Sequence, residues 1–325
     1  MALPLSRRLD FSEIPVIDIS PLVDGNAAQL ERTVAALDRA CSDVGFIYIR
    51  NHGVSRDLVT RLAQQARLFF NRSMDEKMRI VLDQRMRGYL PLNYRSYEGE
   101  ARAGTSHQEG FWIGHERPLS AALPLEGPNQ WPEAVPDLKP TMLAYFSAVE
   151  ELSQVLQRGF ALALGLAPDF FQLLFRVPNS RLKLNHYPPQ DAPEADNDIG
   201  VVPHSDSGGF TILWQDDNGG LEVQSKSGEW VGAPPIDDTF VINLGNVMQI
   251  WTNGKFSSTP HRVINRFGRD RYSVPLFVNP DSDARIAPLI GRATSRGAPD
   301  ATPFRYGDYQ RDEWRRIFPV ARIPA

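Results

Sequence analysis

The chain has 325 residues, of which 42% are hydrophobic and 23% are charged, with a formal net charge of −4. These proportions suit a globular protein with a sizeable core, and they give no electrostatic case for binding nucleic acid or an anionic membrane. The single cysteine, Cys41, excludes a disulfide within the chain and suits a reducing compartment. No apolar run approaches the ~18 residues of a membrane span, and the opening MALPLSRRLD is too short and too polar for a signal peptide, so the cytoplasm is the default compartment.

The first part of the chain alternates between strand and helix patterns. Residues 14–19, IPVIDI, alternate apolar and polar side chains and predict a short strand. Residues 26–45 place apolar side chains at helical spacing and end at a glycine, which predicts a helix. FIYI, at residues 46–49, predicts a second strand, and residues 55–80 predict a second helix.

The middle of the chain divides into a loop-rich stretch and a long helix. Residues 83–136 are rich in glycine, proline and arginine, which predicts a segment dominated by loops. Residues 138–164 carry a wide apolar face at helical spacing, which predicts a long amphipathic helix. Because such a face is too wide for a solvated linker, we expect this helix to pack along a sheet as a brace.

Between residues 181 and 278 the pattern changes to short runs of β-forming residues separated by turn signals such as DDNGG, KSGE and TNGK. Closely spaced strands of this kind favour a sandwich or barrel over a parallel sheet. The tail YGDYQRDEWRRIF predicts a terminal helix, and no internal repeat is present. The predicted strands are LKLNHY, GFTILWQ, LEVQS, FVINLG, MQIW, HRVINR and RYSVPLFV.

A histidine and an aspartate stand two residues apart in VVPHSDSGGFT, at positions 204 and 206. On a strand, residues i and i+2 point to the same face, so His204 and Asp206 can converge on one point. A third candidate, His261, stands at the start of another predicted strand. Two imidazoles and one carboxylate on one side of a metal form the facial triad of non-haem Fe(II) oxygenases, whereas a structural zinc site takes four ligands and usually cysteine. A bare H-x-D pair is more often a surface pair, so its surroundings must decide.

The surroundings resemble a known family. The stretch from HSDSGGFTILWQ to RYSVPLFVNP resembles the catalytic core of the isopenicillin-N-synthase-like 2-oxoglutarate/Fe(II) dioxygenases, and IPVIDIS, GFIYIRNHGV and RGYLPL resemble their amino-terminal region. The resemblance implies a mainly β fold with flanking helices, in which a double-stranded β-helix (a jelly roll, cupin-like) is braced by a long helix. It implies a single catalytic unit, 1–325, with an N-terminal dioxygenase-type region at 11–118 and an Fe(II)/2-oxoglutarate core at 177–281.

The resemblance also assigns roles to individual residues. His204, Asp206 and His261 match the iron ligands of the family, and Arg271 and Ser273 match the Arg-x-Ser that holds the distal carboxylate of 2-oxoglutarate. A guanidinium fork is a bidentate receptor for a carboxylate, and a residue two along a strand faces the same way.

Further residues of the cosubstrate site follow from LNHYPP. Tyr187 matches the family's tyrosine near the cosubstrate, and Asn185 stands two residues before it on the same strand face. His186 points to the opposite face and is a poor candidate for a ligand. The remaining histidines are interpreted as turn or loop residues, namely His52, His107 and His115.

The implied function is that of a dioxygenase that uses Fe(II), 2-oxoglutarate and O₂ to oxidise a small molecule, releasing succinate and CO₂. Hydroxylation is the usual outcome in the family, with desaturation or ring closure as alternatives. No nucleic acid or membrane is expected as a partner, and a monomer is the default. The residues expected to contact the substrate are Tyr89, Trp112, Phe210 and Phe277.

Two other functions are compatible with the same residues. An Fe(II) oxidase of the same superfamily needs no 2-oxoglutarate and uses Arg271 and Ser273 to bind its own substrate's carboxylate. A non-catalytic member of the fold would bind a small molecule as a receptor or sensor, and it would be marked by a damaged triad.

Overall fold

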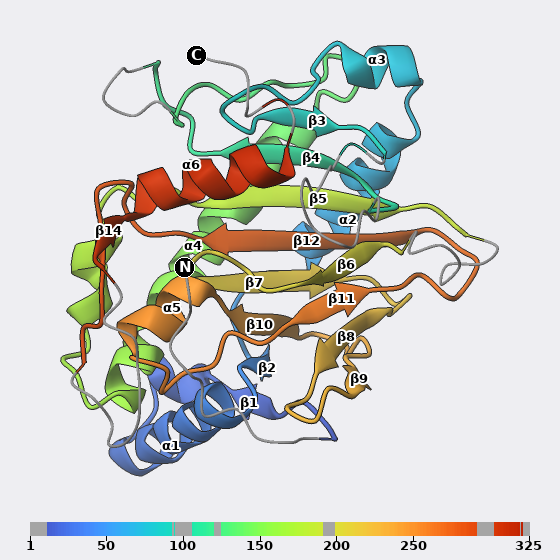
Figure 1. Ribbon diagram of the computed structural model, residues 1–325. Helices are drawn as coiled ribbons and strands as arrows, with labels where there is room; N and C mark the ends of the chain where they lie inside the picture. The colour runs from blue at the N-terminus through green and yellow to red at the C-terminus, as the bar shows by residue number, and fades with distance from the viewer. Residues whose placement is uncertain are drawn as a thin grey trace.

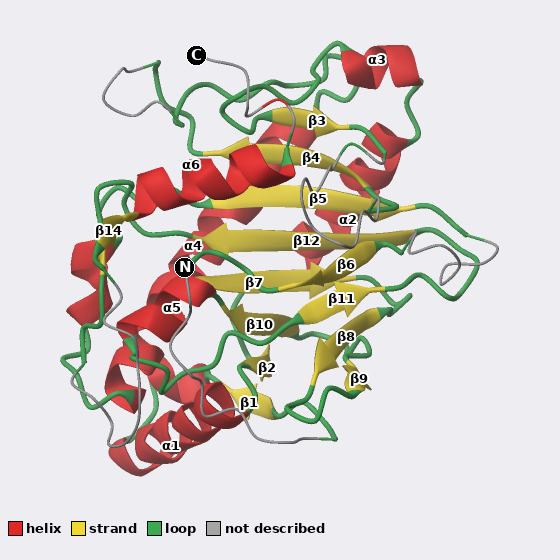
Figure 2. Cartoon of the chain, in the orientation of Figure 1, coloured by secondary structure: helices red, strands yellow, loops and turns green. Residues whose placement is uncertain are grey.

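The computed structural model describes residues 12–92, 94, 106–119, 125–190, 199–290, 302–318 and 320. Two β-sheets face each other, and helices cover the outer side of the larger one (Figures 1 and 2). No helix in these ranges is both long enough and apolar enough to cross a membrane. The opening residues, on which the expectation about a signal peptide depends, lie outside the described ranges.

The larger sheet has eight strands, and its neighbours are antiparallel except for the parallel pair at one edge. Alternation along the inner strands sends one set of side chains toward the smaller sheet and the other toward the helices. The order is β1 (Val16–Asp18), β2 (Phe46–Arg50), β10 (Phe240–Leu244), β7 (Phe210–Gln215), β12 (Arg271–Val278), β5 (Arg181–Tyr187), β4 (Glu109–Gly114) and β3 (Gly88–Leu90).

The smaller sheet has four strands, in the order β6 (Val201–His204), β11 (His261–Val263), β8 (Leu221–Gln224) and β9 (Trp230–Gly232). A layer of buried apolar side chains, which includes Tyr48, Tyr187, Val201, Val223 and Val263, fills the space between the two sheets. This is the double-stranded β-helix that the sequence predicts. A two-stranded ribbon, β13 (Arg285–Ile286) with β14 (Phe304–Arg305), lies apart from both.

Three helices pack on the outer side of the larger sheet: α1 (Ala27–Asp43), α2 (Arg56–Phe70) and α4 (Leu138–Ala163). The long helix α4 has thirteen buried residues, and its Phe160 ring meets the Phe210 ring of β7 edge-on with 5.2 Å between the ring centroids. The expected brace along the sheet is therefore present. Shorter helical elements are η1 (Ser20–Leu22), α3 (Met74–Met78), η2 (Phe170–Leu174), α5 (Asn246–Trp251) and α6 (Tyr306–Ile317).

Two predicted elements differ in the structure. The helix expected over residues 55–80 is divided into α2 and α3, because Ser73 and Glu76 form a reciprocal capping box that starts a new helix. The strand expected at MQIW is wrong, since these residues belong to α5. Every residue from Val247 to Trp251 is buried, and a short segment buried on all sides shows no periodicity that separates a helix from a strand.

The stretch expected to be dominated by loops, residues 83–136, contributes two strands to the larger sheet. All six residues of β4 are buried, so this strand lacks the alternation of polar and apolar side chains by which strands are recognised. Its sequence EGFWIG also contains two glycines, which are uncommon in strands and weaken the sequence signal for a strand. This correction matters for function, because β4 lies beside β5 and its Trp112 lines the second of the two cavities described below.

Candidate active site

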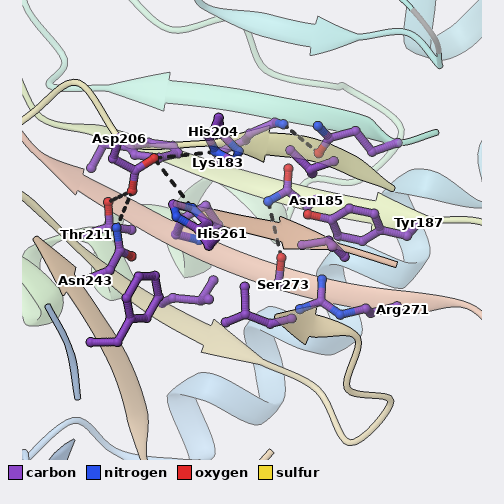
Figure 3. A pocket seen from close by; sticks show the side chains of 18 residues that line it. Lys183, Asn185, Tyr187, His204, Asp206, Thr211, Asn243, His261, Arg271 and Ser273 are labelled. Carbon is purple, nitrogen blue, oxygen red and sulfur yellow. Dashed lines mark hydrogen bonds and ion pairs between the residues drawn. The ribbon is translucent and has the colours of Figure 1, made fainter. Parts of the chain in front are cut away.

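The three predicted iron ligands lie close together between the two sheets, at the ends of β6 and β11 (Figure 3). His204 ends β6, His261 begins β11, and the two residues face each other directly in the antiparallel register. Asp206 lies just past the end of β6, and its Oδ1 is 3.7 Å from His204 Nε2 and 3.9 Å from His261 Nε2. Within the described ranges, this is the only group of three or more His, Cys, Asp or Glu side chains that could hold a metal ion.

Neighbouring side chains fix the orientation of the carboxylate. Asp206 Oδ2 accepts hydrogen bonds from Thr211 Oγ1 at 2.5 Å and from Asn243 Nδ2 at 2.7 Å, which leaves Oδ1 directed at the imidazoles. Burial opposes ionisation of this carboxyl, but His261, His204 and these two donors together lower its pKa below the ordinary value. Asp206 is therefore a carboxylate at neutral pH, as a metal ligand must be.

Backbone carbonyls orient the two imidazoles. His204 Nδ1 lies 2.9 Å from the carbonyl oxygen of Val202, and His261 Nδ1 lies 3.3 Å from that of Thr259. An Nδ1–H that donates to a carbonyl leaves the lone pair of the neutral ring on Nε2, which is the atom that faces Asp206. Two imidazole nitrogens and one carboxylate oxygen on one side of a cavity are a donor set that suits iron(II).

The predicted cosubstrate residues line the same cavity, at the end opposite Asp206 (Figure 3). They belong to two paired strands, in which Arg271 is opposite Tyr187 and Ser273 is opposite Asn185. Because the four residues alternate along β5 and β12, all four side chains face inward. Asn185 Nδ2 donates to Ser273 Oγ at 3.2 Å, so the Ser273 hydroxyl keeps its own hydrogen for another acceptor.

The Arg271 guanidinium is fully buried, and only part of it is used within the protein. Its Nε donates to the carbonyl of Gly219, its Nη2 donates to Gln215 Oε1 at 3.1 Å, and its Cζ lies 4.8 Å from the centroid of the Tyr187 ring. Its Nη1 is buried and has no hydrogen-bond partner among the described residues. A buried donor left over in this way fits the distal carboxylate of 2-oxoglutarate.

A second cavity opens from the metal site and shares His204, Asp206 and Phe277 with the first. Its far wall is α6, the predicted terminal helix, which contributes Trp314 and Arg316. Figure 1 shows α6 in front of the larger sheet, on the side of the smaller sheet.

The four predicted substrate residues divide into two pairs. Trp112 and Phe277 line the second cavity and stack at 5.5 Å with an interplanar angle of 16°. Tyr89 and Phe210 line neither of these two cavities, and their contact with the substrate stays a prediction. Both side chains point to the helix-covered side of the sheet, Phe210 because the next residue on β7, Thr211, takes the inward position.

Sequence reasoning missed other residues of the site. Lys183 lines the cavity from the inward face of β5, two residues before Asn185. Extending the two-residue period of that strand backward would have found it. Thr211 and Asn243 lie on separate strands and carry no local signal. As predicted, His186 faces away from the cavity, with its ring nitrogens 2.7 Å from carboxylate oxygens outside the site.

The fold and the open triad define the class of non-haem iron(II) oxygenases, and comparison with known proteins agrees. Residues 178–280 match the 2OG-Fe(II) oxygenase superfamily, and residues 14–134 match the N-terminal region described as non-haem dioxygenase in morphine synthesis. The chain is 35% identical over 304 residues to the homoarginine-6-hydroxylase 2-ODD-C23 of Glycine max, covering 86% of this chain and 89% of the relative.

Two solved structures extend the comparison. A full-length Neurospora crassa protein, crystallised in complex with alpha-KG and thymine, superposes with a TM-score of 0.81 at 26% identity, covering 91% of this chain and 94% of that one. The dioxygenase for auxin oxidation of rice superposes with a TM-score of 0.72 at 27% identity, covering 96% of this chain and 100% of that one. The chain belongs to the 2OG-Fe(II) oxygenase superfamily. It is an iron(II)- and 2-oxoglutarate-dependent oxidoreductase, and the alternative of an oxidase without 2-oxoglutarate is set aside.

Proposed function

We propose that this protein hydroxylates a C–H bond of a small organic molecule, with iron(II) held by His204, Asp206 and His261 and 2-oxoglutarate anchored by Arg271 and Ser273. The observation that carries this proposal is the unused Nη1 of Arg271, a buried donor in the same cavity as the triad. A cation buried at one end of a cavity and an open metal triad at the other match the two ends of 2-oxoglutarate.

Each residue of the site has a defined task in the proposed reaction. Iron(II), when bound together with 2-oxoglutarate, supplies the O₂-dependent oxidation of a C–H bond and releases succinate and CO₂. Arg271 and Ser273 bind and orient the cosubstrate, and Tyr187 packs against the guanidinium to hold it in place. The buried apolar side chains between the sheets exclude water from the reacting atoms.

The substrate is expected to bind beneath α6, against Trp112 and Phe277. One relative is named for homoarginine, one structural neighbour was crystallised with thymine, and another is named for auxin oxidation; all three compounds are small organic molecules. The stacked indole and phenyl rings of this chain offer a flat apolar wall, suited to hold the substrate carbon near the metal.

The test requires no knowledge of the substrate. Iron(II) and 2-oxoglutarate mixed with the protein without air should give a weak metal-to-ligand charge-transfer band, and air should then cause slow release of succinate. The band should be absent from the His204→Ala variant. If the wild-type protein shows neither the band nor succinate, the proposed site is incorrect.

Compartment and assembly state are also part of the proposal. We place the protein in the cytoplasm, supported by the lone, buried Cys41, and we expect a monomer. Light scattering coupled to size exclusion checks the second expectation, and fractionation of cells checks the first.

A further inference from the structure

Two buried N–H groups in the wall of the second cavity have no acceptor within the described part of the chain. Trp112, on β4, is 5% exposed, and its indole Nε1 has no hydrogen-bond partner there. Arg181, at the start of β5, is fully buried, and its Nε also has no partner. Both side chains line the cavity that opens from the metal site. Because an unpaired buried donor is unfavourable, two of them in one wall indicate a ligand that supplies an acceptor.

The pairing of β4 with β5 brings the two residues together on one face of the sheet. Gly114 is opposite Arg181 in the register of this pair. Trp112 lies two residues before Gly114 on the same face of β4, so Trp112 and Arg181 are diagonal neighbours. Such neighbours are about 7–8 Å apart, within reach of aromatic and long side chains. One end of a small ligand can therefore contact both side chains.

The guanidinium of Arg181 is held in a fixed position by the backbone. Its Nη1 donates to the carbonyl of Ser180 at 3.0 Å, and its Nη2 donates to the carbonyl of Leu125 at 2.7 Å. The Nε–H is the donor that remains for a ligand. Among the described side chains that line the cavity, the carboxylate besides the metal ligand is that of Glu313, which accepts from Arg316 Nη2 at 3.0 Å.

The buried charges around Arg181 are unequal in number. The two oxygens of the buried Glu126 lie 3.0 Å from Arg87 Nη2 and 3.2 Å from Arg181 Nη1. Arg117 Nη1 is 4.0 Å from the same carboxylate. Over the described ranges no other carboxylate is within 4.0 Å of Arg87 or Arg181, so one negative charge serves three cations. Burial lowers the pKa of Arg181 below its ordinary value although Glu126 opposes this, which is consistent with an excess of positive charge.

We infer that Arg181 Nε and Trp112 Nε1 form a subsite for an oxygen acceptor of the substrate, a carboxylate or a carbonyl group. The inference rests on the proposed function, since it assigns the second cavity to the substrate. The excess of buried cations favours the carboxylate. With its acceptor held at this subsite, the substrate has its apolar part against Phe277 and Trp314, in the cavity that His204 also lines.

The first experiment measures binding of matched probes to the protein loaded with iron(II) and saturating 2-oxoglutarate without air. The probes are phenylacetate, with a charged acceptor, phenylacetamide, with a neutral acceptor, and 2-phenylethylamine, whose ammonium has none. Calorimetry should show the acid binding about 10- to 100-fold more tightly than the amine. An amide between the two assigns the subsite to a carboxylate, and an amide equal to the acid assigns it to a carbonyl. An amine that binds as tightly as both, or no binding of either acceptor probe, overturns the inference.

The second experiment removes the neutral donor. Trp112→Phe keeps an aromatic ring and deletes the indole N–H, so the acid and the amide should each bind about 2- to 10-fold more weakly while the amine is unaffected. Trp131→Phe is the matched control, because its indole N–H donates to Glu116 at 2.7 Å and Trp131 lines neither cavity. Undiminished binding of both acceptor probes to the Trp112→Phe variant contradicts the inference.

The third experiment removes the charge. Arg181→Met should weaken the acid more than the amide, so that the ratio of their affinities falls toward one. Arg158→Met is the control, because Arg158 donates to the carbonyl of Leu22 away from both cavities. An unchanged ratio in a folded Arg181→Met variant overturns the inference. Thermal unfolding checks the fold, and if this variant does not fold, the result for Trp112→Phe decides.

The affinity for 2-oxoglutarate is measured in the same variants. It should change less in Arg181→Met than the affinity for phenylacetate does, and an equal or larger loss would assign this cation to the cosubstrate and overturn the inference. Failure of the proposed function is separately visible, because the wild-type protein would then lack the charge-transfer band before any probe is added.

Discussion

Two buried polar clusters lie on opposite faces of the sheet formed by β4, β5 and β12, and they differ in how fully their hydrogen-bonding atoms are used. On the helix-covered face, Glu109 accepts from Lys77 Nζ at 2.8 Å and from the Tyr89 hydroxyl at 2.5 Å, and its other oxygen is 2.7 Å from His186 Nδ1. His186 Nε2 in turn lies 2.7 Å from Asp270. Each charged group of this cluster therefore has a partner within the protein.

On the cavity face of the same strands, several buried polar atoms lack a partner within the protein. Arg271 Nη1, Asn185 Oδ1 and Gln108 Nε2 are all buried, and none has a hydrogen-bond partner among the described residues. Leaving such atoms unpaired costs free energy of folding, and three of them in one cavity beside the metal-ligand triad fit a site completed by ligands. The cluster around Glu109 is paired within the protein, whereas the cavity face keeps polar atoms for ligands.

The largest effect is expected on the cavity face, at the metal ligands. His204→Ala or His261→Ala should abolish turnover and should lower iron affinity by more than the roughly 10–100-fold that loss of a hydrogen-bond partner of a ligand costs. The fold should persist, because the core that stabilises it lies elsewhere. Anaerobic titration that finds undiminished iron affinity in the double variant would disprove the metal assignment.

A large loss of stability is expected from a substitution in the cluster around Glu109. Glu109→Gln leaves the buried Lys77 ammonium without its carboxylate, and such a loss typically lowers the free energy of unfolding by about 3–5 kcal/mol. Urea denaturation measures the change. Asp312→Asn breaks an exposed pair with Arg315 and should cost at most about 1 kcal/mol. Equal effects of the two substitutions would remove the distinction between the clusters.

Substitution of Arg271 should weaken the binding of 2-oxoglutarate. Arg271→Gln removes a charge-assisted contact worth about 2–5 kcal/mol, which corresponds to an apparent KM for 2-oxoglutarate raised roughly 30-fold or more. Iron binding should survive, because Arg271 is not a ligand. Initial rates of succinate release at varied 2-oxoglutarate give the value, and an unchanged KM would show that the cosubstrate binds elsewhere.

The smallest expected effect is the pH dependence of the saturated cluster. Burial alone would raise the pKa of Glu109, but the hydrogen bonds from His186, Lys77 and Tyr89 outweigh it and lower the pKa below its ordinary value. The resulting stabilisation is fully present above the unfolded pKa of ~4.3 and is lost as pH falls through the lower folded value. Wild-type protein should therefore lose more stability below about pH 4 than Glu109→Gln does. Parallel pH profiles of the two proteins would contradict this assignment.

Much of the site could be predicted from the sequence, for identifiable reasons. The alternation of a strand relates Arg271 to Ser273, whereas Asp206 lies past the end of the strand that carries His204, and a family resemblance supplies the order of these motifs. The face to which Tyr89 and Phe210 point could not be predicted, because facing depends on which strands surround them. The placement of α6 over the cavity could not be predicted either, because an amphipathic pattern indicates that a helix packs against the protein but not on which surface it packs.

The helix α6 forms one wall of the second cavity, where the substrate is proposed to bind. This helix lies outside both the larger and the smaller sheet. The metal ligands and the cosubstrate residues, in contrast, all lie on strands of these sheets or directly beside them. Substitutions at Arg316 or Ile317 can therefore reshape the cavity without shifting the register that holds the triad. The part of the cavity wall that α6 supplies can thus vary independently of the strands that carry the metal ligands, and directed evolution for a new substrate is best begun on α6.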